Sequence, residues 1–110
     1  MRLPNGDQAV VPLDKLLDYC LNPEHPRGQH KARVFAAALG ITSAEADCLR
    51  AELLAAAATR DAMAAEADDF GQRFVLDFEM EGFTGSVQVR SLWIIRRGEE
   101  IPRLTSCYVL

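Results

Sequence analysis

Two neighbouring ionisable side chains, His30 and Lys31, follow a segment that cannot be helical. Residues 22–28 contain two prolines, a glycine and a second histidine, His25. An imidazole can donate or accept a proton near neutral pH, an ammonium carries a fixed charge, and the start of a helix attracts anions. This pattern is typical of a corner that faces phosphate. The other interpretation is a helix-capping region with two exposed polar side chains.

The last quarter of the chain offers a second set of polar side chains. Alternation along an extended strand puts Arg103 and Thr105 on one face, and Ser106 and Tyr108 on the other. Arg90 lies in the middle of the preceding strand, where a charge is costly unless it meets solvent or a partner. Together these groups indicate a cradle for an oxyanion or phosphate, although strand hydroxyls are more often plain sheet residues. Thr105 and Tyr108 share a face only if a bulge intervenes.

The charge distribution permits a small basic patch on an acidic chain. The 110 residues include 12 basic and 16 acidic side chains, a net charge of -4. Most of the acidic excess lies in residues 40–85, and both ends of the chain are mildly basic. If the ends converge, the patch can meet phosphates. The other interpretation is solvated surface charge, since a pI near 5.1 is unusual for a nucleic-acid binder. The basic residues are Arg27, Lys31, Arg33, Arg90, Arg96, Arg97 and Arg103.

Composition and motifs exclude several classes of protein. The length predicts one domain, residues 1–110, and no apolar run is long enough to span a membrane. The N-terminus lacks the apolar stretch of a signal peptide, so we expect a cytoplasmic chain or a fragment delivered by another protein. Three widely spaced cysteines without a paired motif predict reduced thiols and no zinc site. The chain has no phosphate-binding loop, dinucleotide fingerprint or nucleophile elbow, so we expect no metal and no cofactor.

Hydrophobic periodicity predicts helices first and strands afterwards. Apolar residues at helical spacing indicate helices over residues 12–20, 29–39 and 44–58, the third opened by a capping box at residues 42–45. Alternation indicates strands over 73–80, 87–96 and 101–109, and a weaker one over 63–67. This order predicts an α+β fold, with about three helices on one face of a mostly antiparallel sheet of about four strands. The expected buried stripes are Leu13, Leu16, Leu17 and Cys20, and Ala32, Phe35, Ala36 and Leu39.

Short motifs follow one another along nearly the whole chain. They are Leu3-Pro4-Asn5; Leu21-Asn22-Pro23-Glu24-His25-Pro26-Arg27-Gly28 with Lys31, Ala32, Phe35, Leu39 and Gly40; Phe70-Gly71-Gln72-Arg73-Phe74; and Trp93-Ile94-Ile95, Gly98 and Ile101-Pro102-Arg103-Leu104-Thr105-Ser106 with Tyr108-Val109. Their order resembles a family of small bacterial domains of unknown function. These domains occur at the C-termini of polymorphic toxins, including contact-dependent inhibition and Rhs-type proteins, and as free-standing proteins. They are similar to the barnase–EndoU–colicin–RelE group of metal-independent ribonucleases.

The resemblance implies a barnase- or RelE-like toxin domain that cleaves RNA without a metal, with tRNA as one candidate substrate. Its active face is the concave side of the sheet, covered by the second helix. Lys31 and Arg90 stabilise charge, and His30 is the candidate general base or acid. The implied partners are RNA and a cognate antitoxin or immunity protein; the oligomeric state stays open. Thr105 and Tyr108 bind phosphate or orient the nucleotide, and Arg27, Arg33 and Arg103 contact RNA.

Two other hypotheses compete with a ribonuclease. The first is a non-catalytic interaction module, either immunity- or antitoxin-like or a degenerate relative of the toxins. The acidic residues 61–81 favour it, because acidic immunity proteins mask basic nuclease faces. The second is a small structural domain with no nucleic-acid role. Geometry discriminates between the ribonuclease and the interaction module. Convergence of Lys31, Arg90 and Thr105 in one cleft favours the ribonuclease, whereas scatter of these residues with a contiguous acidic surface favours the interaction module.

Overall fold

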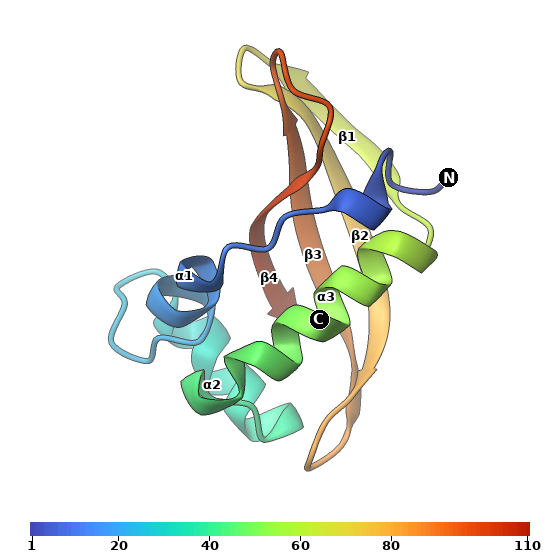
Figure 1. Cartoon of the computed structure of the whole chain (residues 1–110). Helices are drawn as coiled ribbons and strands as arrows, with labels where there is room; N and C mark the ends of the chain where they lie inside the picture. The colour runs from blue at the N-terminus through green and yellow to red at the C-terminus, as the bar shows by residue number, and fades with distance from the viewer.

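The helices precede the strands along the chain, as the periodicity predicts. A computed structural model describes residues 1–110 and contains α1 (Leu13–Lys15), α2 (Gln29–Leu39) and α3 (Ala46–Thr59). Four strands follow: β1 (Met63–Asp68), β2 (Gly71–Glu81), β3 (Ser86–Arg96) and β4 (Arg103–Val109). The sheet is antiparallel throughout, with strand order β1-β2-β3-β4, and α3 runs diagonally across it (Figure 1). The expected α+β class is confirmed.

The first helix differs from the predicted amphipathic helix because it changes pitch. After α1 the chain forms a π-helical turn, Leu16–Cys20, closed by a 2.8 Å bond from the Leu21 N–H to the Leu16 carbonyl. The wider turn buries Leu16 and Cys20 completely, but Leu13 and Leu17 remain 39% and 38% exposed. The predicted stripe is therefore only half correct. π-Helical turns are rare and occur frequently at functional sites.

The second helix has the predicted bounds, whereas the third begins with a 3₁₀ turn, Ser43–Glu45, and continues as α3. Gly40 ends α2 with φ 69°, a left-handed conformation that glycine adopts without strain. The capping box is present before α3, since the Glu45 carboxylate accepts from the Thr42 N–H at 2.9 Å. Ala36 is exposed, contrary to prediction, because α2 buries only one narrow stripe. That stripe consists of Ala32, Phe35 and Leu39.

The sheet buries one face against the helices by alternation, and Ile94, next to Trp93 on β3, is the exception because it is buried on the other face. On β2 the buried residues are every second one, and on β3 the same face continues across the hairpin. Ser91 is the one polar residue in this buried set, and its hydroxyl donates to the Leu76 carbonyl at 2.6 Å and accepts from the indole N–H of Trp93 at 2.9 Å. These two bonds satisfy groups that would otherwise be costly to bury. The buried residues on the helix-covered face of β2 and β3 are Phe74, Leu76, Phe78, Met80, Val89, Ser91 and Trp93.

A bulge in β4 changes which side chains share the uncovered face. Ser106 pairs with Leu92 and Leu104 pairs with Trp93, so Thr105 is the extra residue. The inward-facing residues Leu104 and Cys107 are both buried although two residues separate them. Thr105 and Tyr108 therefore line one cavity, which simple alternation does not allow.

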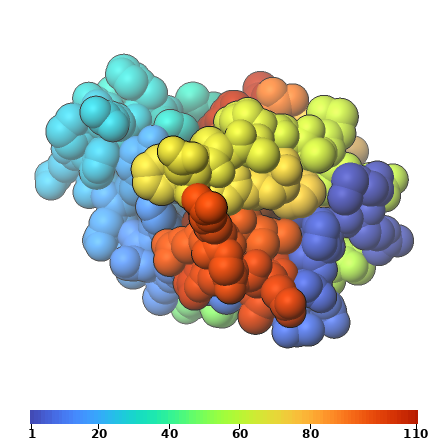
Figure 2. Space-filling model, turned by 90° about the horizontal axis from the view of Figure 1, so that it is seen from above, coloured from blue at the N-terminus to red at the C-terminus, as the bar shows by residue number.

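The N-terminal segment and two loops close the remaining edge and end of the sheet. The Val10 carbonyl accepts from the Leu104 N–H at 3.0 Å, so the segment after the first turn runs beside β4. At the end seen in Figure 2 the β1–β2 turn lies against the β3–β4 loop, joined by a 2.9 Å bond from the Arg97 N–H to the Phe70 carbonyl. None of the helices combines the length and the apolar surface that crossing a membrane requires.

Candidate functional site

Strand register brings Asp77, Arg90 and Tyr108 into one row across three strands. Arg90 is paired with Asp77 on β2 and with Tyr108 on β4. Its guanidinium donates two parallel hydrogen bonds to the Asp77 carboxylate, both at 2.8 Å. The hydrogen bond from Arg90 lowers the pKa of Asp77. The pKa of Arg90 is raised, mainly by Asp77 and to a smaller extent by Tyr108. Both members of the ion pair are therefore charged at neutral pH.

This row borders a cavity of about 300 Å³ on the face of the sheet opposite the core. The Thr105 hydroxyl donates to the Leu92 carbonyl at 3.1 Å. Arg73, in the same cavity, is held by Asp68 at 3.0 Å. No helix residue lines the cavity, although Lys31 of α2 lies beside the ring of Tyr108, which does line it. The lining residues are Ala65, Glu66, Arg73, Phe74, Val75, Arg90, Leu92, Trp93, Thr105 and Tyr108.

Lys31 approaches this face from the side of β4. Its ammonium donates a 2.9 Å hydrogen bond to the Tyr19 hydroxyl and lies 4.9 Å from the centroid of that ring. It also lies 5.8 Å from the centroid of the Tyr108 ring. No carboxylate forms an ion pair with Lys31, so its positive charge is not neutralised within the protein. Cation–π contacts fix the position of the ammonium without cancelling its charge.

Tyr19 also holds His25, and sequence reasoning did not single out Tyr19. The two rings meet edge to face with centroids 4.9 Å apart. The His25 Nδ1 accepts from the backbone N–H groups of Arg27 at 2.9 Å and Gly28 at 3.0 Å. The signal for Tyr19 is weak in the sequence, because its contact with Lys31 depends on the π-helical turn and on the path of the loop between them.

The structure does not bring His30 together with the other predicted side chains. His30 is exposed on α2, and its side chain forms no hydrogen bond with another residue. Adjacent residues on an α-helix point about 100° apart, so His30 leaves the face that Lys31 occupies. His25, five residues earlier, is the histidine that contacts this part of the molecule through Tyr19.

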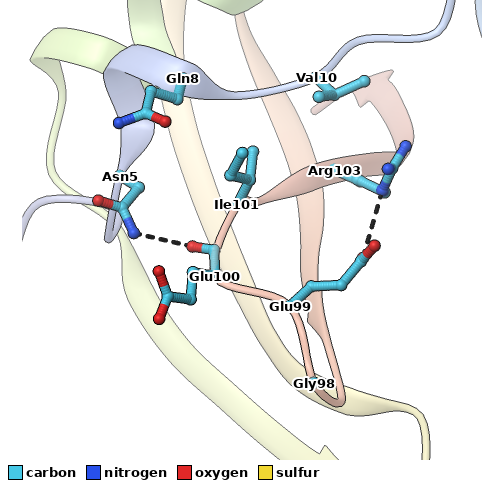
Figure 3. A pocket seen from close by; sticks show the side chains of 8 residues that line it. All are labelled: Asn5, Gln8, Val10, Gly98, Glu99, Glu100, Ile101 and Arg103. Carbon is cyan, nitrogen blue, oxygen red and sulfur yellow. Dashed lines mark hydrogen bonds and ion pairs between the residues drawn. The ribbon is translucent and has the colours of Figure 1, made fainter.

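The three arginines predicted to contact RNA lie in three different places. Arg27 is exposed beside His25, and Arg33 is exposed on another side of α2. Arg103 lies at the far end of β4, in a cavity of about 450 Å³ between the N-terminal turn and the β3–β4 loop (Figure 3). There it pairs with Glu99 at 3.4 Å, while Asn5 donates to the Glu100 carbonyl at 2.8 Å. The three arginines therefore do not form one patch.

The donor groups near Lys31 suit anion binding and proton transfer. Lys31 and Arg90 offer positive charge, and Thr105 and the two tyrosines offer hydroxyl groups. No three His, Cys, Asp or Glu side chains come close enough to hold a metal ion. Preorganised cations of this kind stabilise negative charge that develops on a phosphoryl group.

Comparisons with known proteins identify the fold and the family. A search of curated proteins gives no match. Among solved structures, a chain of the "Contact-dependent growth inhibition toxin - immunity protein complex from Klebsiella pneumoniae 342" is similar, with a TM-score of 0.69 and 14% identity. The match covers 92% of this chain and 99% of that one, and at this identity it shows a shared fold. Residues 2–110 match a single family, and the chain belongs to that family, described as Domain of unknown function (DUF6883).

Proposed function

We propose that this protein is a small metal-independent endoribonuclease of a toxin system. The observation that carries the proposal is the ammonium of Lys31, which is held between two tyrosine rings and has no neutralising carboxylate. Arg90, Thr105 and Tyr108 line the cavity beside it. A phosphodiester is the kind of substrate that uses a free cation, an arginine and hydroxyl donors together.

The reaction needs three contributions from these side chains. The ribose 2′-oxygen attacks phosphorus while a base takes the 2′-hydroxyl proton, and the bond to the 5′-oxygen breaks as an acid supplies a proton there. Lys31 and Arg90 stabilise the added negative charge, and Thr105 and Tyr108 bind the phosphate. The resemblance implied His30 as the acid or base. The phenols of Tyr19 and Tyr108 lie nearer to Lys31 and are the alternative proton donors or acceptors.

The fold similarity supports a toxin system with a cognate partner. The similar chain comes from a complex of a growth-inhibition toxin and an immunity protein, as its title states. The partner expected here is an antitoxin or immunity protein that covers the Lys31 face and prevents RNA from reaching it. Carboxylates on such a partner complement the free charge of Lys31. RNA, with tRNA as one candidate, is the proposed substrate.

A non-catalytic interaction module is the second candidate function, and a specific observation favours it. The charge of Arg90 is already matched by Asp77 through two hydrogen bonds of 2.8 Å. An arginine held in this way is less available to a phosphate. In that case the protein is the immunity- or antitoxin-like member of such a system, or a degenerate relative of the toxins.

Cleavage of total cellular RNA in the presence of a chelator tests the proposal. The wild type is compared with Lys31→Ala and with a control, Arg60→Ala, whose exposed side chain at the end of α3 forms no ion pair. We expect discrete fragments from the wild type and the control, and a rate about 100- to 1000-fold lower from Lys31→Ala. Intact RNA with every folded protein would contradict the ribonuclease and favour the interaction module. Equal cleavage by all three proteins would contradict the role of Lys31.

A further inference from the structure

A cavity of about 390 Å³ lies on the surface formed by α1, the π-helical turn and the loop that precedes α2. Tyr19 belongs both to this cavity and to the surroundings of Lys31, so the two sites share a wall. A ligand pocket for a small molecule needs at least about 300 Å³, and this cavity meets that size. Its lining residues are Asp14, Lys15, Asp18, Tyr19, His25 and Arg27.

His25 is held in this cavity as a fixed hydrogen-bond donor. Because its Nδ1 accepts from two backbone N–H groups, the ring hydrogen lies on Nε2. The edge-to-face contact with Tyr19 fixes the plane of the ring from the other side. The Nε2–H group has no acceptor within the protein, although the rest of the ring is fully engaged. Such a donor is positioned before a ligand arrives, which reduces the entropy that binding costs.

The other polar side chains of the cavity are also unpartnered. Lys15 and Arg27 carry positive charge, and Asp14 and Asp18 carry negative charge. None of these four forms an ion pair within the chain. A complementary ligand must therefore offer an anion to the cations and the imidazole, and N–H donors to the carboxylates. A nucleotide whose base has an exocyclic amino group meets both requirements, and its base can pack against the Tyr19 ring.

We propose that this cavity binds one nucleotide of the RNA strand next to the phosphate that is cleaved, and that it prefers guanine, adenine or cytosine to uracil. The phosphate oxygens accept from the Nε2–H of His25 and contact Lys15 or Arg27. The base amino group donates to Asp14 or Asp18. This inference rests on the proposed ribonuclease function and adds a base preference to it, since uracil has no exocyclic amino group to offer the carboxylates.

The test is a nuclear magnetic resonance titration of the whole protein with guanosine monophosphate and, separately, with uridine monophosphate. We expect guanosine monophosphate to shift the ring signals of His25 and Tyr19, and to bind at least fivefold more tightly than uridine monophosphate. His25→Asn places an amide oxygen where Nδ1 stands, so it keeps the loop bonds but removes the Nε2 donor. This variant should bind both nucleotides at least fivefold more weakly.

A second variant isolates the contribution of the carboxylates. Asp14→Ala combined with Asp18→Ala should abolish the preference for guanosine monophosphate, while Asp47→Ala, at an exposed aspartate on α3, should preserve it. Equal binding of both nucleotides, or the same shifts with inorganic phosphate alone, would overturn the proposal. RNA cleavage without nucleotide shifts at His25 would overturn it and leave the ribonuclease standing. Nucleotide binding without RNA cleavage would support the cavity and contradict the ribonuclease.

Discussion

Replacing Ser91 by alanine is expected to destabilise the protein through the indole of Trp93. The Ser91 hydroxyl accepts from the Trp93 Nε1–H at 2.9 Å and donates to the Leu76 carbonyl at 2.6 Å, and both tryptophan and serine are at most 1% exposed. Alanine removes this acceptor at a place that solvent does not reach. A buried donor without an acceptor costs about 1–3 kcal/mol.

The expected loss is therefore about 2 kcal/mol in the free energy of unfolding. With a urea dependence of about 1.5 kcal/mol per M for a chain of this size, the midpoint of unfolding falls by about 1.3 M. The matched control is Ser86→Ala, because the Ser86 hydroxyl donates to Glu79 at 2.9 Å on the exposed surface. This control should stay within about 0.5 kcal/mol of the wild type.

Urea unfolding followed by circular dichroism measures all of these variants. In a Trp93→Phe background there is no indole N–H to leave unsatisfied, so Ser91→Ala should cost less than about 1 kcal/mol there. An equal cost in both backgrounds would refute the assignment of the effect to the indole. A change below about 0.5 kcal/mol for Ser91→Ala in the wild type would refute the reasoning as a whole.

Three further predictions concern the site and its surroundings. Gly28→Ala should cost about 1–3 kcal/mol in urea unfolding, because a Cβ there overlaps the Tyr19 carbonyl oxygen; an unchanged midpoint would contradict that packing. Arg90 lowers the pKa of Asp77 in the folded protein below the ordinary aspartate pKa of 3.8. The ion pair therefore stabilises the fold fully above pH 3.8, and this stabilisation is lost as the pH falls through the pKa that Asp77 has in the folded protein. The stability difference between the wild type and Asp77→Asn should therefore shrink between pH 6 and pH 3, and a constant difference would exclude the pair as its source. A thiol reagent should label one cysteine of the native protein, Cys48, and all three in denaturant, and rapid labelling of more than one native thiol would contradict the burial of the other two.

The sequence predicted the elements whose signals are local. The capping box before α3, Gly40 at the end of α2 and the alternation along β2 each depend on residues within a few positions of one another. Local hydrogen bonds and backbone preferences determine such features, so they appear at the expected residues. Local signals do not explain the candidate site, where Arg90, Thr105 and Tyr108 line one cavity and Lys31 lies beside the Tyr108 ring.

One contact could have been predicted from the sequence and was not. The turn at residues 82–85 fixes the β2–β3 register, and that register places Asp77 opposite Arg90. Opposite charges directly across a hairpin attract each other. Counting outward from the turn would therefore have identified the carboxylate that fixes Arg90.

Only the tertiary structure decided how the pieces of the site meet. The bulge at Thr105 and the π-helical turn that contains Tyr19 each insert one residue into a regular pattern, and hydrophobic periodicity averages over such changes. The Tyr19 contacts with Lys31 and His25 join segments whose relative positions depend on packing against β4. The sequence by itself determined which groups are available for chemistry. Long-range packing determined that His25, and not His30, contacts Tyr19 beside Lys31, because the path of a loop depends on what it packs against.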